Sequence, residues 1–172
     1  MRPGISSWKR NAILLGGEMG AQAFSITNGW KNCDTCCGLY KGTADICVGG
    51  SKTHGNSKGG AGGITEGSVP GYQDNWRLCK KCGLLFYYGN PTNGVCFKGG
   101  DHDLGTSPNY SLAKRATESD SSSPNYYNMW RWCQKCECLI LGGNLNGKVG
   151  SCPKGASHDF SKSAYYSISW TY

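Results

Sequence analysis

Cysteine and histidine residues recur in this chain in a fixed order, three cysteines followed by one histidine, three times over. The spacings are C-x2-C-x10-C-x6-H, C-x2-C-x13-C-x5-H and C-x2-C-x15-C-x5-H. The three sets are Cys33, Cys36, Cys47 and His54; Cys79, Cys82, Cys96 and His102; and Cys133, Cys136, Cys152 and His158. A C-x2-C turn directs two thiolates to one point, and a further cysteine and histidine complete the tetrahedron that Zn²⁺ prefers. The spacing therefore predicts three structural zinc ions, one in each Cys3His site.

A disulfide framework is the main alternative for so many cysteines. It fits poorly, because three cysteines per set cannot pair within the set and the total of 11 is odd. It also gives histidine no role, although all three histidines of the chain occupy the fourth position. Iron–sulfur clusters usually take four cysteines. Cys37 and Cys138 lie outside the pattern and are predicted to be small buried side chains.

The residues around the ligands also repeat. Each copy reads W-x2-C-x2-C-x2-L, a glycine-bearing turn, C, a Gly pair or Gly-Ala, then H, beginning at Trp30, Trp76 and Trp130. A serine and a Tyr-x-[Leu/Ile] tail follow in the second and third copies, but the tail cannot be placed in the first. The predicted organisation is an N-terminal extension or contact arm, 1–24, and a single three-lobed β domain, 25–172, with repeats at about 25–71, 72–125 and 126–172.

The elements that position these ligands are predicted to be short strands. In the second repeat we expect strands at Trp76–Leu78, Leu84–Tyr88, Gly94–Phe97 and Tyr110–Leu112. About four strands per repeat give about twelve, the number in a β-trefoil, with the three tryptophans in a shared core. The alternative is three tandem zinc ribbons, but a lone repeat would bury little apolar surface. We therefore expect an all-β, β-trefoil-like fold with one zinc stapling each lobe.

The stretch WRLCKKCGLLFYYGNPTNGVCFKGGDHDLGTSPNYSL resembles a repeat module, W-x2-C-x2-C-x2-L-[FY]-x2-G…G-x-C-P-x-G-G-x-H…S-x2-Y-x-L. That module occurs in tandem in secreted or surface proteins of bacteria and fungi. The resemblance is close in the second and third copies, weaker in the first, and absent before about residue 25. Phe97 replaces the usual proline, whereas Pro153 retains it. The resemblance implies an extracellular or surface-associated location and a recognition role.

A non-catalytic, lectin-like module that binds glycans or a cell surface is therefore the leading functional hypothesis. Aromatic faces beside amides suit sugar rings, although turn formation and packing also explain these residues. The candidates at the hairpin tips are Tyr87, Tyr88, Asn90, Asn93, Asn144 and Asn146. Catalysis is not expected, because closed four-ligand zinc sites leave no position for water. Asp103 and Asp159, which follow ligand histidines, are interpreted as turn residues or residues that support the ligands.

Two further hypotheses stay open. One is a structural subunit of a larger assembly, with self-association or a partner contact through 1–24. The other, less favoured, is nucleic-acid binding through basic residues in or beside the C-x2-C turns, which we call knuckles. These residues are Arg77, Lys80, Lys81, Arg131 and Lys135. The formal charge of +7 falls to about +4 once each dication is bound by three thiolates. No apolar run reaches the roughly 18 residues of a membrane span, and Glu18 interrupts the short run that imitates a signal peptide.

Overall fold

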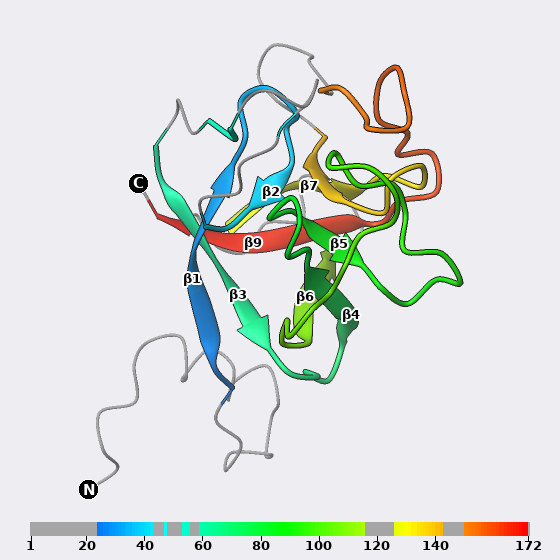
Figure 1. Ribbon diagram of the computed structural model, residues 1–172. Helices are drawn as coiled ribbons and strands as arrows, with labels where there is room; N and C mark the ends of the chain where they lie inside the picture. Colours follow the sequence, from blue (N-terminus) through cyan, green and yellow to red (C-terminus); the bar gives the residue numbers. More distant parts are fainter. Residues whose placement is uncertain are drawn as a thin grey trace, which may run out of the picture.

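The computed structural model describes residues 24–42, 47, 53–55, 59–115, 126–142 and 150–171. Within these ranges the protein is all-β, with nine strands and no helix (Figure 1). The strands are β1 (Ile26–Asn32), β2 (Leu39–Tyr40), β3 (Ala61–Glu66), β4 (Tyr72–Leu78), β5 (Leu85–Tyr87), β6 (Tyr110–Arg115), β7 (Tyr126–Trp132), β8 (Leu139–Leu141) and β9 (Tyr165–Thr171). The predicted all-β class is therefore confirmed, while the extension 1–24 lies outside the described residues except for its last position.

Each repeat contributes three of these strands. Its first strand pairs antiparallel with both of the others: β1 with β2 and β3, β4 with β5 and β6, and β7 with β8 and β9. The prediction of a fourth strand at Gly94–Phe97 is wrong. That segment is a loop in which the Cys96 N–H donates to Gly100 O and the Gly99 N–H donates to Cys96 O. These turn contacts bring the Cys96 thiol inward and leave no ladder for a strand.

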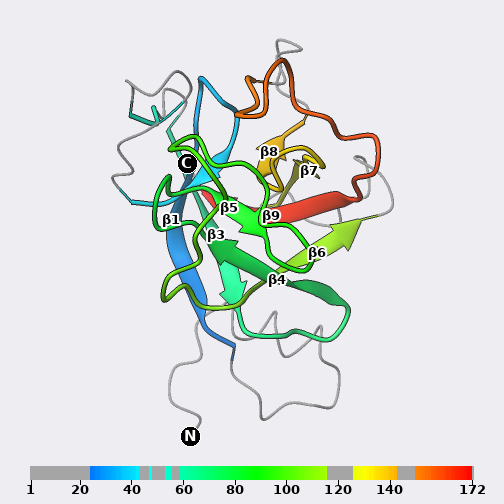
Figure 2. The same cartoon turned by 45° about the vertical axis from the view of Figure 1, so that its right-hand side comes forward.

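Two closed rings of strand pairing join the repeats. In the first ring, the C-terminal half of β3 pairs with the start of β6, the end of β6 with the start of β9, and the end of β9 with the start of β3 (Figures 1 and 2). In the second, single bridges link Tyr40 to Leu84, Phe86 to Cys138, and Ile140 to Gly38. Each repeat is therefore bonded to both others, and the sheet is nearly closed.

The core is built from one tryptophan per repeat. Trp30, Trp76 and Trp130 are fully buried, which confirms the prediction that they are core residues. Tyr110 of the second repeat packs edge-on against Trp30, with ring centroids 5.3 Å apart, and Tyr166 of the third packs the same way against Trp76 at 5.2 Å. The aromatic tails thus cover the tryptophan of the preceding repeat.

The first repeat breaks this pattern in a way that locates its missing tail. Trp76 and Trp130 pair in register with Tyr110 and Tyr166, whereas Trp30 pairs with Gly62. Gly62 therefore occupies the tyrosine position, and its tail is Gly62-Gly63-Ile64. The space is filled by Trp170 of β9, whose ring lies 6.0 Å from that of Trp130 and directly over Gly62.

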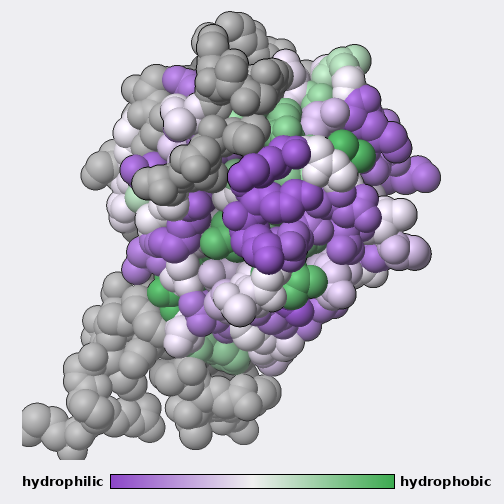
Figure 3. All heavy atoms as spheres, in the orientation of Figure 1, coloured by the Kyte–Doolittle hydropathy of each residue, from purple (hydrophilic) through white to green (hydrophobic). Residues whose placement is uncertain are grey.

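The described surface is mostly polar. Figure 3 shows hydrophilic side chains over much of one face, with apolar residues scattered between them. Tyr88 is the one large hydrophobic side chain of the described residues that is exposed, at 40%. No helix long and apolar enough to cross a membrane occurs in the part of the chain that the structure describes.

Candidate metal centres

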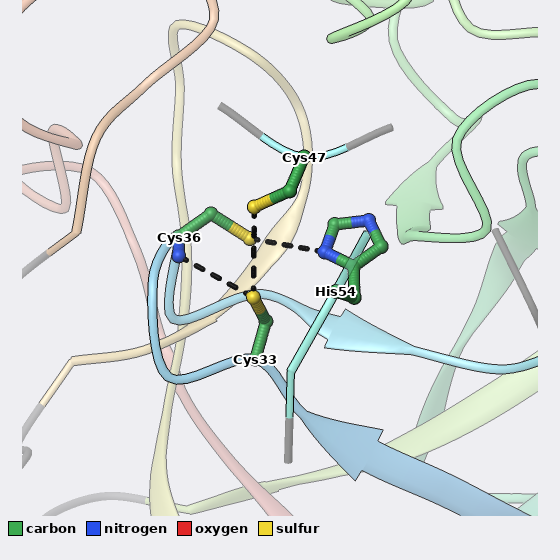
Figure 4. A group of neighbouring side chains, drawn as sticks. All are labelled: Cys33, Cys36, Cys47 and His54. Carbon is green, nitrogen blue, oxygen red and sulfur yellow. Dashed lines mark hydrogen bonds between the residues drawn. The ribbon is translucent and has the colours of Figure 1, made fainter. Parts of the chain in front are cut away.

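Each predicted set of four ligands converges on a single point. The first cluster (Cys33, Cys36, Cys47, His54), the second cluster (Cys79, Cys82, Cys96, His102) and the third cluster (Cys133, Cys136, Cys152, His158) each place their ligand atoms within 4.8 Å of one another. Every one of these residues is buried. Figure 4 shows the first cluster: its four side chains point toward one another, and Cys33 and Cys36 project from the turn between β1 and β2.

The distances within the clusters match a metal tetrahedron. Zn–S and Zn–N bonds of about 2.3 and 2.05 Å imply S···S edges of about 3.8 Å and S···N edges of about 3.6 Å. The Sγ···Sγ separations are 3.6 Å for Cys33–Cys47 and 3.9 Å for Cys79–Cys96. The Sγ···Nδ1 separation between the second ligand cysteine and the histidine is 3.6 Å in every cluster. Because none of the 11 cysteines, all of which the structure describes, forms a disulfide, the clusters fit metal ions and not disulfides.

The three C-x2-C turns are held by the same backbone hydrogen bonds. In the first, the Cys37 N–H donates to Cys33 O at 2.9 Å and the Cys33 N–H to Gly38 O at 2.9 Å, and the other two turns repeat both contacts. The residue after the second cysteine is left-handed in all three: φ is 59° at Cys37, 73° at Gly83 and 67° at Glu137. In the first turn the left-handed residue is therefore Cys37 and not the glycine that follows it, Gly38.

Gly38 is instead required by packing between repeats. A Cβ built on it would lie 2.5 Å from a Leu84 side-chain carbon across the second ring of bridges. Cys37 and Glu137 thus accept a conformation that costs about 1–2 kcal/mol for a residue with a Cβ. Glu137 offsets part of this through its carboxylate, which accepts hydrogen bonds from Trp132 Nε1 at 2.8 Å and Asn90 Nδ2 at 2.9 Å.

In the metal-free first cluster, the interactions among the ligands favour a charged Cys33 sulfur beside protonated Cys36 and His54. A hydrogen bond from Cys36 lowers the pKa of Cys33, and the same interaction raises the pKa of Cys36. Burial alone would lower the pKa of His54, but hydrogen bonds and charge from the cluster's sulfurs outweigh it and raise that pKa to about 9. His102 behaves in the same way, with a pKa of about 9. A bound dication has to displace these protons.

The second ring nitrogen of each histidine reaches into the next repeat. His54 Nε2 lies 2.9 Å from Cys82 O, His102 Nε2 lies 3.0 Å from Cys136 O, and His158 Nε2 lies 3.1 Å from Cys36 O. Since a carbonyl only accepts, Nε2 carries the proton and Nδ1 is the ligand atom. Each acceptor is the second ligand cysteine of the neighbouring cluster. The sequence gives no sign of this ring, because any residue supplies a carbonyl.

The predicted sugar-binding residues are mostly engaged inside the protein. Asn90 donates to Glu137, and Asn93 Nδ2 lies 3.5 Å from His102 O. Tyr87 packs against Trp76 with ring centroids 5.3 Å apart. Tyr88 alone presents a face to solvent, and the Arg77 guanidinium lies 5.7 Å from its ring centroid. Asn144 and Asn146 lie outside the described residues.

The basic residues near the knuckles also make hydrogen bonds and an ion pair within the protein. Lys81 Nζ donates to Gly99 O and Asp101 O at 2.7 Å each, and Lys80 pairs with Asp103 at 3.2 Å. Lys135 bridges the carbonyls of Gly155 and Ser157, Arg131 donates to Phe160 O, and Arg77 donates to Asn109. These contacts tie the basic side chains to loops of their own repeat.

The remaining sequence predictions concern residues beside the ligands. Asp103 and Asp159 accept the N–H groups of Gly105 at 2.9 Å and Ser161 at 3.0 Å, as turn residues do. Cys37 and Cys138 are buried, as predicted. Cys138 Sγ lies 3.2 Å from His102 Nε2, beside the second cluster.

No protein-family model, curated protein or solved structure matches the chain.

Proposed function

We propose that this protein is a non-catalytic recognition module whose three structural zinc ions staple a β-trefoil-like body. The observation that carries the proposal is the closure of the metal centres: three thiolates and one imidazole surround each point, and all of them are buried. Such a set satisfies a tetrahedral ion completely and leaves no position for water or substrate. Borderline-soft Zn²⁺ suits ligation by sulfur and nitrogen better than the hard cations do.

The three-lobed, β-trefoil-like description is supported by recurrence of the strand pairing at equivalent residues. Every repeat orders its strands the same way, and both rings close through all three repeats. The structure departs from a β-trefoil because one strand of each lobe is missing. The described part of each repeat has three strands, whereas a trefoil lobe has four. We infer that the loop carrying the third cysteine and the histidine replaces that strand, with the metal holding it in place.

Metal analysis of the native protein tests this proposal. We expect three zinc ions per chain and loss of β structure when a strong chelator removes them. Cys36→Ala, which deletes a ligand, should lower the zinc count to two or fewer, whereas Cys37→Ala, at the adjacent buried position, should leave it at three. A wild-type count below three, or folding that survives chelation unchanged, would overturn the proposal.

Carbohydrate recognition is the ligand class that we propose for the surface, and its support is the exposed ring of Tyr88. A tyrosine face backed by a guanidinium offers an amphipathic platform for a sugar ring, and shallow sites gain strength through multivalency. Glycan-array binding should be insensitive to salt, be lost in Tyr88→Ala and persist in Tyr88→Phe. Binding that falls steeply with salt would instead indicate nucleic acid. Secretion, and assembly through 1–24, stay predictions.

A further inference from the structure

The ring of histidine–carbonyl contacts links the three metal centres to one another. We propose that the three clusters take up and release their ions as a coupled ring and not as independent sites. This inference rests on the proposed function, because it concerns the zinc ions assigned there. It follows from the two simultaneous roles of each imidazole: Nδ1 faces its own cluster, and Nε2 donates to a ligand residue of the next.

Loss of the ion from one cluster weakens the hydrogen bond between its histidine and the neighbouring knuckle. When the ion leaves the first cluster, the His54 ring keeps its stacking on Tyr40, with ring centroids 4.8 Å apart, but loses the bond that fixes Nδ1. The contact of Nε2 with the Cys82 carbonyl at 2.9 Å is then weakened. Both groups are buried, so water does not readily replace the weakened bond. The backbone of Cys82 also orients its thiolate, so a shift of this backbone displaces a ligand atom of the second cluster.

Further contacts make each knuckle dependent on the preceding repeat. The carbonyl after the second ligand cysteine also accepts from that repeat: Lys41 N–H to Gly83 O at 3.0 Å, Tyr87 N–H to Glu137 O at 2.8 Å, and Leu141 N–H to Cys37 O at 2.8 Å. At two of the three knuckles a glycine of the preceding repeat packs on the ligand carbonyl itself, because a Cβ on Gly94 would overlap Cys136 O and one on Gly150 would overlap Cys36 O. A knuckle therefore cannot shift without disturbing the repeat that carries the donor histidine.

The histidine–carbonyl contacts form a closed ring. The histidine of the first repeat donates to the second repeat, that of the second donates to the third, and His158 of the third donates to Cys36 O of the first. Each cluster is thus bonded to both others. Because coupling free energy is reciprocal, a metal bound at any cluster raises the affinity of its neighbours.

Chelator titration of the wild-type protein, followed by native mass spectrometry, tests the coupling without mutation. We expect mainly the three-zinc and zinc-free species, with one-zinc and two-zinc species well below the binomial proportions that equal, independent sites give. Partially loaded species at or above those proportions would overturn the coupling. A starting protein with fewer than three zinc ions would instead overturn the proposed function, so the two failures are distinguishable.

A pair of histidine variants tests the direction of the ring. Cysteine can replace histidine as the fourth zinc ligand, but it has no N–H to donate to the next repeat. Under chelator competition, His54→Cys should expose the cysteines of the second cluster to an alkylating reagent roughly 10- to 100-fold faster. The third cluster keeps its donor, so its labelling should follow that of the second cluster and not precede it. His158→Cys should expose the first cluster first, with the second cluster following; His102 is avoided because Cys138 also contacts it.

Peptide mapping of the alkylated cysteines gives the answer for each cluster separately. The proposal is overturned if each variant labels only the cluster that carries the substitution. It is also overturned if the cluster that kept its donor is labelled before the cluster that lost it. The two variants predict different orders of labelling for the clusters that they affect, so a general loss of stability does not imitate the expected pattern.

Discussion

A methyl group added at Gly94 has no room, and this gives a sharp test of how tightly the repeats are joined. Gly94 is buried with φ of 69°, and a Cβ there would overlap the backbone carbonyl of Cys136. That carbonyl is the acceptor of His102 Nε2 at 3.0 Å. Gly94→Ala therefore forces a left-handed alanine and also pushes the third knuckle away from its donor.

The two costs can be separated because Gly99 lies in the same loop. It is left-handed as well, with φ of 93°, but nothing lies within 4 Å of a Cβ built on it. Gly99→Ala should cost only the left-handed strain, about 1–2 kcal/mol. Gly94→Ala should add about 1–3 kcal/mol for buried donor and acceptor groups that lose each other. The expected difference in the free energy of unfolding is about 2 kcal/mol.

Urea denaturation at a fixed free zinc concentration measures this difference, since metal binding otherwise changes apparent stability. With a slope of about 2 kcal/mol per M, Gly94→Ala should unfold about 1 M below Gly99→Ala. The third repeat offers a second matched pair, because Gly150 overlaps Cys36 O in the same way and Gly155 is open. Equal midpoints within either pair would refute the reasoning that the glycines are required for contact between repeats.

Three further results are expected. Ala156→Gly should raise the free energy of unfolding by about 0.5–1 kcal/mol, because Ala156 is exposed and left-handed (φ 56°) where the second repeat has Gly100; a loss of stability in urea denaturation would contradict this. Zinc affinity should fall as pH falls below about 9, by about tenfold per pH unit for each proton that the ion displaces. The reason is that His54 and His102, each with a pKa of about 9, then hold protons that zinc must displace. Competition with a chelator of known pH dependence measures the affinity, and a flat pH profile would contradict the prediction. Trp170→Ala should destabilise the protein by about 2–3 kcal/mol by emptying a partly buried site, and a loss below about 0.5 kcal/mol would show that the indole fills no necessary space.

The metal clusters could be predicted from the sequence because their signal is carried by side chains. Cysteine and histidine that recur together at regular spacing indicate metal ligation, and all twelve predicted ligands lie in the three clusters. The fully buried tryptophan at the start of each repeat could be predicted for the same reason. Positions that depend on the backbone could not: the glycine at Gly83 is typical of a left-handed turn, but Cys37 and Glu137 adopt the same conformation without glycine.

Contacts between repeats were harder to predict than contacts within them. The tail of the first repeat was hidden because glycine replaces tyrosine at Gly62, and Trp170, distant in sequence, fills the space. Gly94–Phe97 has the composition of a hairpin strand, yet its role is to deliver Cys96. The roles of surface residues are ambiguous in the sequence for a physical reason: amides such as Asn90 are equally suited to a sugar hydroxyl and to a neighbouring buried carboxylate.

The closed ring also sets an order of events during synthesis on the ribosome. Cys82 O and Cys136 O receive their donors from histidines that emerge before them, His54 and His102. Cys36 O waits for His158, which is 122 residues further along the chain. The earliest knuckle to be translated is therefore the last to be completed, and until then its ligands are the most accessible to competing metals and oxidants.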